Sequence, residues 1–215
     1  VSFGYTEILT HSFAGSGEVP LENPLAPAQS FLRPSLIFGL ATAVENNLKF
    51  FDTAALFEIG SVFHKKTNHE PAEEIRCGIA LAGKSIKDHD AFRCMRGVVE
   101  ELLRIAGVPS YALTEENKAL VITVNGEAIG TVEKTDGGKA GACAEFSITK
   151  LLPFISRAKH FKEIPKYPSI VRDVSFIVEK SAKAGAVLDA AWHDTPKDLQ
   201  NSAFVVLYEG KGIPE

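Results

Sequence analysis

One stretch of the sequence matches the pattern of a phosphate-binding loop. Residues 78–85 read Gly-Ile-Ala-Leu-Ala-Gly-Lys-Ser, which satisfies GxxxxGK[ST]. Such a loop needs an apolar strand before its first glycine and a helix after its lysine, because amides at the helix start bind the phosphates. Here the apolar residues lie between the two glycines, and three glutamates precede them in residues 70–77. The sequence therefore predicts a strand that runs into a turn, and no nucleotide site at Lys84.

Histidine and cysteine residues offer a second possible chemistry, zinc binding. Structural zinc sites take their ligands from closely spaced pairs such as C-x2-4-C or H-x3-5-H. His64 and His69 have that spacing, but no CxxC pair accompanies them, and Cys77, His89 and Cys94 follow at unrelated intervals. We therefore expect surface histidines, core cysteines and no metal site.

No arrangement typical of acid–base or nucleophilic catalysis is present either. The adjacent carboxylates Glu73-Glu74 and Glu100-Glu101 point in different directions on a strand or a helix, so they do not form a catalytic pair. The sequence contains no G-x-S-x-G elbow and no dinucleotide-binding fingerprint. We predict that the chain carries no catalytic residue.

Basic and aromatic residues become denser after residue 155. Lysine and arginine bind phosphates, and an aromatic ring stacks on a base, so together they form a minimal kit for single-stranded RNA. A solvated linker with one buried tryptophan explains the same residues, and the pattern leaves both interpretations open. The residues are Lys159, Lys162, Lys166, Tyr167, Arg172, Trp192 and Lys211.

The composition limits the class of protein. A length of 215 residues allows one or two domains, and a net charge of −4 argues against a surface that binds nucleic acid everywhere, although a local basic patch remains possible. The three cysteines indicate reduced thiols rather than a disulfide framework. No apolar run approaches the ~20 residues of a membrane span. Because the sequence begins in the middle of a pattern, we expect it to be part of a longer chain.

The periodicity of residues 1–157 predicts an α+β domain with a mixed, largely antiparallel sheet. Residues 119–125 and 128–133 flank Asn125-Gly126, the favoured signal for a tight hairpin. Ser35 is a suitable N-cap for a helix of about three turns. The other predicted strands are 2–13, 56–63, 75–82 and 143–148. The other predicted helices are 92–106 and a short one at 149–155 that Pro153 interrupts.

A second domain is predicted over residues 158–215. The proline-containing segment 161–168 is typical of an extended linker. A strand at 171–179, a helix at 182–194 and a strand at 203–209 follow it. A β-α-β unit alone leaves a sheet edge unpaired, so we expect this domain to be incomplete.

Three blocks of the sequence resemble the β subunit of bacterial phenylalanyl-tRNA synthetases, in the family's order. They extend over almost the whole chain, and three blocks in register make the resemblance specific. It implies a class II synthetase-like core at 1–157 and the start of a ferredoxin-like anticodon-binding domain at 158–215. The blocks are Asn23-Pro24-Leu25-Ala26-Pro27 with 31–40 and 56–63, then 95–103, and then 164–175 with 208–214.

Within the resemblance, one departure bears on activity. A catalytic class II synthetase has an arginine after the strand that corresponds to 57–63, and this arginine holds the ATP α-phosphate. Here that position is His64, which at neutral pH is not a permanent cation. No glycine-rich ATP-binding block ending in arginine follows. The resemblance therefore implies a synthetase fold without nucleotide chemistry.

The resemblance implies a non-catalytic core that packs against the catalytic α subunit in a cytoplasmic (αβ)2 enzyme, with tRNA-Phe as the second partner. No cofactor is expected on this chain, because the whole enzyme uses Mg-ATP on α, and neither membrane nor DNA is an expected partner. A stand-alone interaction module and an independent ATP-using enzyme remain alternatives. The candidate tRNA-binding residues are Lys162, Lys166, Arg172 and Lys211, and the candidate structural residues are Asn23, Pro24, Arg33, Ser35, Gly39, Glu58 and Gly60.

Overall fold

The chain divides into two compact units, residues 1–160 and residues 161–215. The domain boundary predicted between residues 157 and 158 falls in the segment 157–165, outside the described residues. The computed structural model describes residues 3–66, 70–84, 86, 88–135, 141–156, 166–179, 181–182, 184–193, 199 and 202–208.

Unit 1 is built on a seven-stranded sheet with the strand order β1-β4-β5-β9-β8-β7-β6. Neighbouring strands are antiparallel except β1 and β4, which run parallel, and β2 and β3 form a separate antiparallel pair. The strands are β1 (Thr6–Glu7), β2 (Phe13–Ala14), β3 (Phe31–Leu32), β4 (Thr53–Lys65), β5 (Pro71–Gly83), β6 (Tyr111–Glu116), β7 (Ala119–Val124), β8 (Glu127–Lys134) and β9 (Gly141–Ser147).

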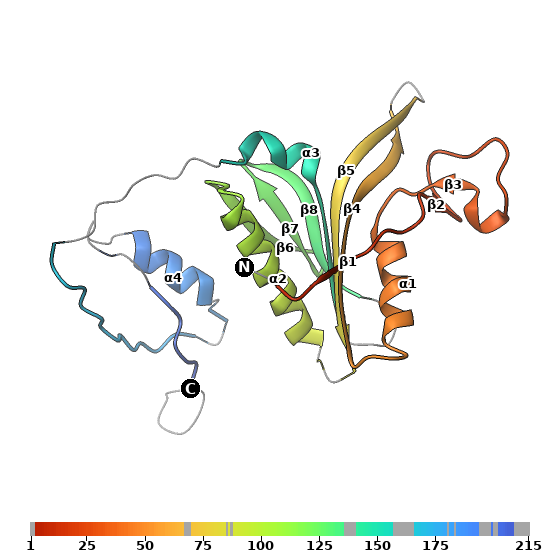
Figure 1. Ribbon diagram of the computed structural model, residues 1–215. Coiled ribbons are helices and arrows are strands. Elements are labelled where there is room, and N and C mark those ends of the chain that lie inside the picture. The colour runs from red at the N-terminus through yellow and green to blue at the C-terminus, as the bar shows by residue number, and fades with distance from the viewer. Residues whose placement is uncertain are drawn as a thin grey trace. The chain divides into compact units, whose positions relative to one another are not determined.

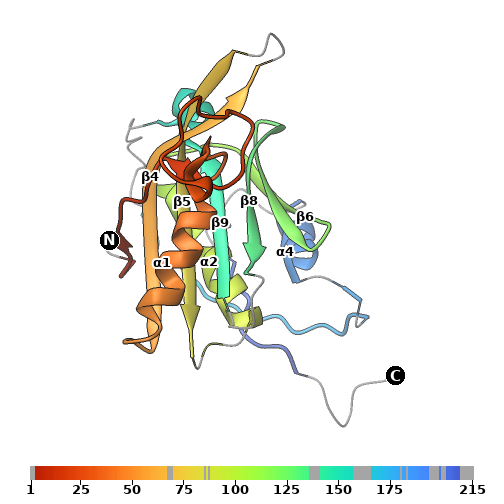
Figure 2. The same ribbon diagram turned by 90° about the vertical axis from the view of Figure 1, so that its right-hand side faces the viewer.

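Two helices cover opposite faces of this sheet, so unit 1 has three layers (Figure 1). Helix α1 (Ile37–Asn47) lies on one face, and the loop that carries β2 and β3 lies near its N-terminal end (Figure 2). Helix α2 (Asp88–Ile105) lies on the other face. The predicted α+β class is confirmed for unit 1. The short elements are η1 (Pro27–Gln29), α3 (Ile148–Leu151) and η2 (Leu152–Phe154).

The larger core lies beneath α2. Met95, Val99 and Leu103 repeat at helical spacing and are almost fully buried against the sheet. Gly107 follows with φ +71°, a left-handed conformation that glycine adopts without strain. The predicted helix at 92–106 is therefore confirmed, and it starts earlier than predicted, at Asp88.

The second core lies beneath α1. Leu36, Leu40 and Val44 are buried against β4, β5 and β9. The helix approaches β5 closely because Gly78 has no side chain, since a Cβ there would lie 2.7 Å from Cδ1 of Leu40. The phosphate-loop pattern is thus a packing feature. Gly78 to Gly83 belong to β5, which confirms the strand predicted at 75–82 and extends it by one residue here, and Lys84 forms an ion pair with Asp52 at 3.2 Å.

The hairpins of unit 1 agree with the predicted turn at one position and add strand residues that were not predicted. Asn125 and Gly126 both have positive φ and join β7 to β8, which confirms the predicted turn. A second left-handed turn at Asn117 and Lys118 joins β6 to β7. Lysine at a left-handed position is an unusual turn signal, so β6 was not predicted. Strands β4 and β5 extend beyond their predicted limits because each pairs with the other along its full length.

One prediction near the start of unit 1 is wrong. The predicted strand at 2–13 contains only β1 and the first residue of β2, because most of this segment runs past the edge of β4 without a ladder. The short helix predicted at 149–155 with an interruption at Pro153 is confirmed, as the α turn α3 followed by the 3-10 turn η2, which contains Pro153. Proline lacks the amide hydrogen that a longer α-helix would need there.

Unit 2 contains one helix within its described residues, α4 (Ala184–His193), which confirms the helix predicted at 182–194. The predicted strands are not formed, since 171–179 and 203–208 are described without a ladder. Residue 209 lies outside the described residues. Apolar side chains of 171–179 and 203–208 are exposed, among them Val171, Val174 and Phe204. A strand exists only with a partner, and these two segments do not pair with each other.

The three cysteines differ in environment. Cys77 and Cys143 are buried, whereas Cys94 is exposed, so the prediction of core cysteines is wrong for Cys94. Burial raises the pKa of the Cys77 thiol to about 12, and the nearby Glu145 carboxylate adds to this. A protonated, enclosed thiol reacts slowly, because the thiolate is the nucleophile.

We therefore expect a single fast thiol in the folded chain. Near neutral pH, 5,5′-dithiobis(2-nitrobenzoate) should label Cys94 quickly, and Cys77 and Cys143 only as the chain unfolds. Absorbance of the released thiolate measures both phases. A Cys94→Ser variant is the matched control and should show no fast phase, and a fast phase in this variant would contradict the described core.

Candidate functional site

Five of the seven predicted structural residues lie around the N-terminal part of α1, and two do not. Arg33 and Ser35 connect β3 to α1, Gly39 lies in α1, and Glu58 and Gly60 lie in β4. Asn23 and Pro24 lie apart from them, exposed in the loop before η1. The polar side chains in this region form two groups, which include Arg33, Ser35 and Glu58. We call these groups the core charge cluster and the helix-cap cluster.

The core charge cluster consists of Thr10, Arg33 and Glu58. Arg33 Nη1 lies 2.7 Å from Glu58 Oε1 and donates to Thr10 Oγ1 at 2.9 Å, while Nε donates to the carbonyl oxygen of Ser61 at 2.8 Å. The Thr10 hydroxyl donates to Glu58 Oε2 at 2.6 Å, and its amide donates to Oε1 at 3.2 Å. The Arg33 and Glu58 side chains are 8% and 1% exposed. Both charges are buried, paired and hydrogen-bonded.

Glycines make the space for this cluster. A Cβ on Gly60 would overlap Nη2 of Arg33, and a Cβ on Gly39 would lie 2.5 Å from Oγ1 of Thr10. Neither glycine has a positive φ, so space, not backbone conformation, explains both. The structural role expected of Arg33 consists of bonds from its side chain to the segment around Thr10 and to β4.

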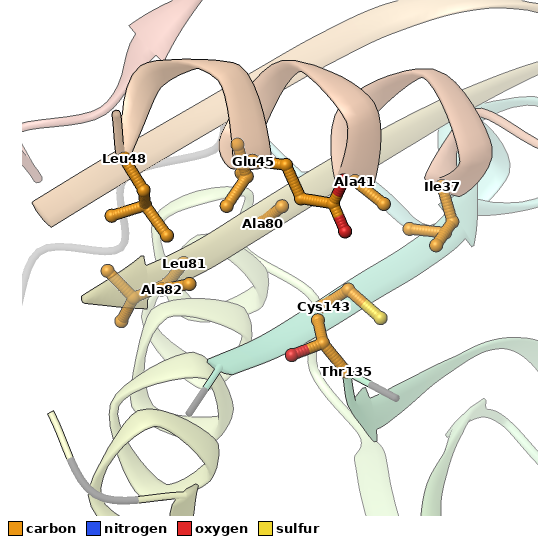
Figure 3. Close-up of a pocket in the computed structure, with 10 residues that line it drawn as sticks. Ile37, Ala41, Glu45, Leu48, Ala80, Leu81, Ala82, Thr135 and Cys143 are labelled. Atoms are coloured by element: carbon orange, nitrogen blue, oxygen red, sulfur yellow. The ribbon is translucent and has the colours of Figure 1, made fainter. Parts of the chain in front are cut away.

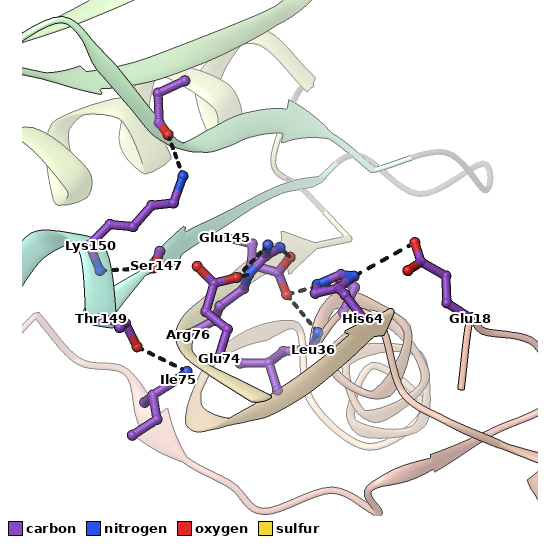
Figure 4. A network of polar contacts seen from close by, with 12 residues as sticks. Glu18, Leu36, His64, Glu74, Ile75, Arg76, Glu145, Ser147, Thr149 and Lys150 are labelled. Carbon is purple, nitrogen blue, oxygen red and sulfur yellow. Dashed lines mark hydrogen bonds and ion pairs between the residues drawn. The ribbon is translucent and has the colours of Figure 1, made fainter. Parts of the chain in front are cut away.

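The helix-cap cluster consists of Ser35, Glu74, Arg76 and Glu145, of which Figure 4 labels the last three. Glu145 Oε1 accepts from the Leu36 amide at 2.6 Å and from Ser35 Oγ at 3.0 Å. Glu145 Oε2 accepts from Arg76 Nη1 at 2.9 Å, and Arg76 also pairs with Glu74 at 2.7 Å. Ser35 Oγ in turn accepts from the Ile37 amide at 3.1 Å, and Ser35 stands one residue before Leu36, the N-cap of α1.

Charge pairing changes the titration of this cluster. Burial alone would raise the pKa of Glu74, but hydrogen bonds from Ser147 and Arg76 and the charges of Arg76 and Lys150 hold that pKa below its usual range. Burial opposes the charged form of Arg76, yet its bonds to Glu74 and Glu145 raise its pKa. The network therefore stabilises the ionised form of both partners.

These contacts fill the positions where a helix start would bind an external anion. Amides at a helix N-terminus attract anions, and Glu145 supplies one from within the chain. Arg33 and Arg76 are each neutralised by carboxylates of the same chain, and Lys150 pairs with Glu127 at 3.0 Å. Each cation within these two clusters is thus engaged by a carboxylate of the chain itself.

His64 lies on β4, at the position where catalytic relatives were expected to have an arginine. Its Nδ1 is 3.8 Å from Glu18 Oε1, which forms an ion pair only when the imidazole is protonated. Its Nε2 is buried, without a hydrogen-bond partner within the described part of the chain. The imidazole cannot replace a permanent guanidinium, which carries its charge at any physiological pH and donates bidentately.

The predicted tRNA-binding residues are described only in part. Lys166 and Arg172 are exposed in unit 2, whereas Lys162 and Lys211 lie outside the described residues. The predicted absence of a metal site stays a prediction. Among residues whose side chains are described, no group of three His, Cys, Asp or Glu side chains could hold a metal ion, but His69 and the His89 side chain are not described. No helix within the described ranges is long and apolar enough to cross a membrane.

Sequence reasoning missed Thr10, Arg76 and Glu145. Glu145 carried a usable signal, since it is the only charged residue among the seven of β9, Gly141–Ser147. A lone carboxylate in a buried strand requires a partner. Thr10 and Arg76 carried no such signal, because their partners are set by tertiary contacts.

We expect Glu58→Gln to unfold unit 1 readily. The change leaves Arg33 as a buried, unpaired cation, which costs about 3–5 kcal/mol of the free energy of unfolding. Urea titration followed by circular dichroism measures it. The matched control is Glu100→Gln, which breaks the exposed Arg96–Glu100 pair of α2 at 3.0 Å. That control should cost about 0.5 kcal/mol or less, and equal costs for both variants would contradict the buried pair.

A family model described as "Phenylalanyl tRNA synthetase beta chain CLM domain" matches residues 1–132. The phenylalanine–tRNA ligase β subunit of Syntrophus aciditrophicus is 25% identical over 252 residues, which cover 99% of this chain and 31% of that protein. The Bacillus licheniformis β subunit is 30% identical over 219 residues, which cover 91% of this chain and 27% of that protein. The chain thus spans about a third or less of these relatives.

Among solved structures, the pyrrolysyl-tRNA synthetase from Desulfitobacterium hafniense is similar in fold, with a TM-score of 0.57 at 14% identity over 69% of this chain and 62% of that one. A second structure of this synthetase gives a TM-score of 0.55. Unit 1 therefore has the fold of a class II synthetase core. With the family model covering more than half of the sequence, the chain belongs to the phenylalanine–tRNA ligase β-subunit family.

Proposed function

We propose that unit 1 is a non-catalytic synthetase core that assembles with the catalytic α subunit of phenylalanine–tRNA ligase. In this proposal the enzyme is a cytoplasmic (αβ)2 assembly, and α binds Mg-ATP and forms the phenylalanyl-adenylate. The observation that carries it is that Arg33 and Arg76 are each paired with carboxylates of the same chain. The position after Phe63 on β4, where an arginine was expected in a catalytic synthetase, is His64.

Electrostatics argues against nucleotide chemistry at this position. An arginine that holds an activated phosphate must be free to accept it. Moving Arg33 to a phosphate would leave Glu58, 1% exposed, as a buried and unpaired carboxylate. A phosphate at the start of α1 would have to displace Glu145 from the Leu36 amide. Both clusters therefore favour a structural role.

An apolar surface beside the clusters supports assembly with a protein partner. Leu9, Phe13, Leu25 and Phe38 are exposed, with Leu25 at 94% and Phe38 at 66%. We call these four residues the apolar rim. Leu9, Phe13 and Phe38 line a groove of about 490 Å³ between α1 and the segment before β2. Large exposed apolar residues that gather in one place are typical of protein interfaces.

For unit 2 we propose a ferredoxin-like domain that contacts tRNA-Phe. The order of an extended segment, α4 and a second extended segment fits the first half of this fold. In its split β-α-β arrangement a further strand lies between the two strands, which is consistent with segments that do not pair directly. Lys166 and Arg172 are exposed in this unit and would provide phosphate contacts, and Lys162 and Lys211 are the other candidates.

We expect the chain to co-elute with its cognate α subunit in size-exclusion chromatography, and to catalyse no ATP–pyrophosphate exchange by itself. Phe38→Asp and Leu25→Asp should weaken the complex roughly tenfold or more, because each buries an unpaired charge in the interface. Leu152→Asp is the matched control, since Leu152 is 59% exposed but lies in η2, outside the rim.

Two results would contradict this proposal. Exchange activity of the purified chain alone would show an independent ATP-using enzyme. Failure of the unaltered chain to bind α would instead favour a stand-alone interaction module with a synthetase fold. If α binds but the rim variants match Leu152→Asp, then the assembly stands and the interface lies elsewhere.

For tRNA contact we expect Lys166→Glu/Arg172→Glu to weaken binding of tRNA-Phe to the complex with α. Each lost phosphate contact should reduce the slope of log K against log salt by about 0.7–0.9. Filter binding across salt concentrations measures this. Lys49→Glu, an exposed lysine of unit 1 that contacts Asn46, is the control. Unchanged affinity and slope in the double variant, and in Lys162→Glu/Lys211→Glu, would overturn the footprint.

A further inference from the structure

A small apolar cavity of about 70 Å³ lies between α1 and the sheet of unit 1 (Figure 3). Alanines leave the space, because a methyl group fills less volume than the leucines that pack nearer the start of the helix. Its walls are Ile37 and Ala41 from α1, Leu48 at the C-cap of α1, Ala80 and Ala82 from β5, and Cys143 from β9.

The mouth of this cavity is polar and carries a negative charge. Glu45 and Thr135 border the space, and in Figure 3 the Glu45 carboxylate lies beneath α1, on the side that faces Cys143. Among the described residues Glu45 has no hydrogen-bond or ion-pair partner.

The position of Glu45 in the helix strengthens the negative potential. Glu45 belongs to the last turn of α1, which contains no basic residue. The carbonyl dipoles at a helix C-terminus add partial negative charge to that of the carboxylate. A cation at the mouth of the cavity would be attracted by the carboxylate and by the helix end.

We propose that this cavity binds a short primary alkylammonium ion. The alkyl tail fills the apolar cavity, and the ammonium group binds Glu45 and the Thr135 hydroxyl. The volume sets the length of the tail. A cavity of about 150 Å³ holds the six carbons of benzene, so one of about 70 Å³ holds roughly three carbons. This site goes beyond the proposed function, since it needs neither α nor tRNA.

The test uses n-propylammonium on the full chain, followed by NMR chemical shifts of backbone amides. Few ligand atoms limit the affinity, so we expect a dissociation constant in the millimolar range. Saturable shifts should appear at Ala41, Ala80 and Cys143. n-Propanol, of the same length but neutral, should bind several-fold more weakly, and n-hexylammonium should not enter fully.

Two variants test separately the volume of the cavity and the charge of Glu45. Ala41→Leu fills the cavity from the helix side and keeps a strong helix former, so it should abolish the saturable shifts. Glu45→Gln should weaken n-propylammonium about threefold to fivefold, the effect of losing an exposed ion pair, and leave n-propanol unchanged.

The proposal is overturned if n-propylammonium gives no saturable shifts in the unaltered chain. It is also overturned if Ala41→Leu binds as well as the unaltered chain, since the ligand then lies elsewhere. Equal loss of n-propanol and n-propylammonium in Glu45→Gln would remove the role of the carboxylate. Since only the isolated chain is used, failure here leaves the assembly with α untouched.

Discussion

The buried pair of Arg33 and Glu58 constrains the arrangement of unit 1. It joins three segments that the sequence separates: the stretch around Thr10, the exit of β3 and the middle of β4. Two charges this deeply enclosed are tolerated only when they are paired and when their remaining hydrogen-bonding groups are satisfied. The glycines at 39 and 60 follow from this requirement, because a side chain at either position would occupy the space of the cluster.

The requirement that buried charges be paired also leaves no free cation within the two clusters for a phosphate. Glu145 binds the first amide of α1 and Arg76 at once, so a carboxylate of the chain occupies the place of an external anion. Such a network is stable as long as it is complete. Opening it for a phosphate would leave Glu74 or Glu145 unpaired while still partly enclosed, which is costly. A chain with the fold of a synthetase core thus satisfies these polar groups by contacts within itself.

Local patterns predicted the elements whose signals lie within a few residues. The apolar spacing of Met95, Val99 and Leu103 predicted α2, and Asn125-Gly126 predicted the turn between β7 and β8. The resemblance identified Arg33, Gly39, Glu58 and Gly60 as structural residues without saying that they meet. Their contact follows from the pairing of Glu58 with Gly78 in the sheet and the close approach of α1, and neither is visible in a local pattern.

Prediction failed where a segment's conformation depends on a distant partner. Residues 171–179 and 203–208 have strand-forming side chains, yet a strand needs a neighbour for its backbone groups, and these segments do not provide it for each other. Asparagine and lysine at 117 and 118 adopt a left-handed turn because β6 and β7 pair on both sides of it. In both cases propensity was a weak guide, and pairing decided the outcome.

Helix α1 shows how one element can hold a rigid and a loosely packed part. Its first turn is fixed by Glu145, Ser35 and the close contact between Leu40 and Gly78, so a substitution there disturbs paired charges or a tightly packed surface. In the middle of the helix, Ala41 lines the cavity together with Ala80 and Ala82 of β5. An unfilled cavity lowers the free energy of unfolding, by roughly 24 cal/mol for each Å³. The contacts of the first turn therefore have to hold the helix against the sheet, and a side chain or a ligand that fills the cavity would recover part of this cost.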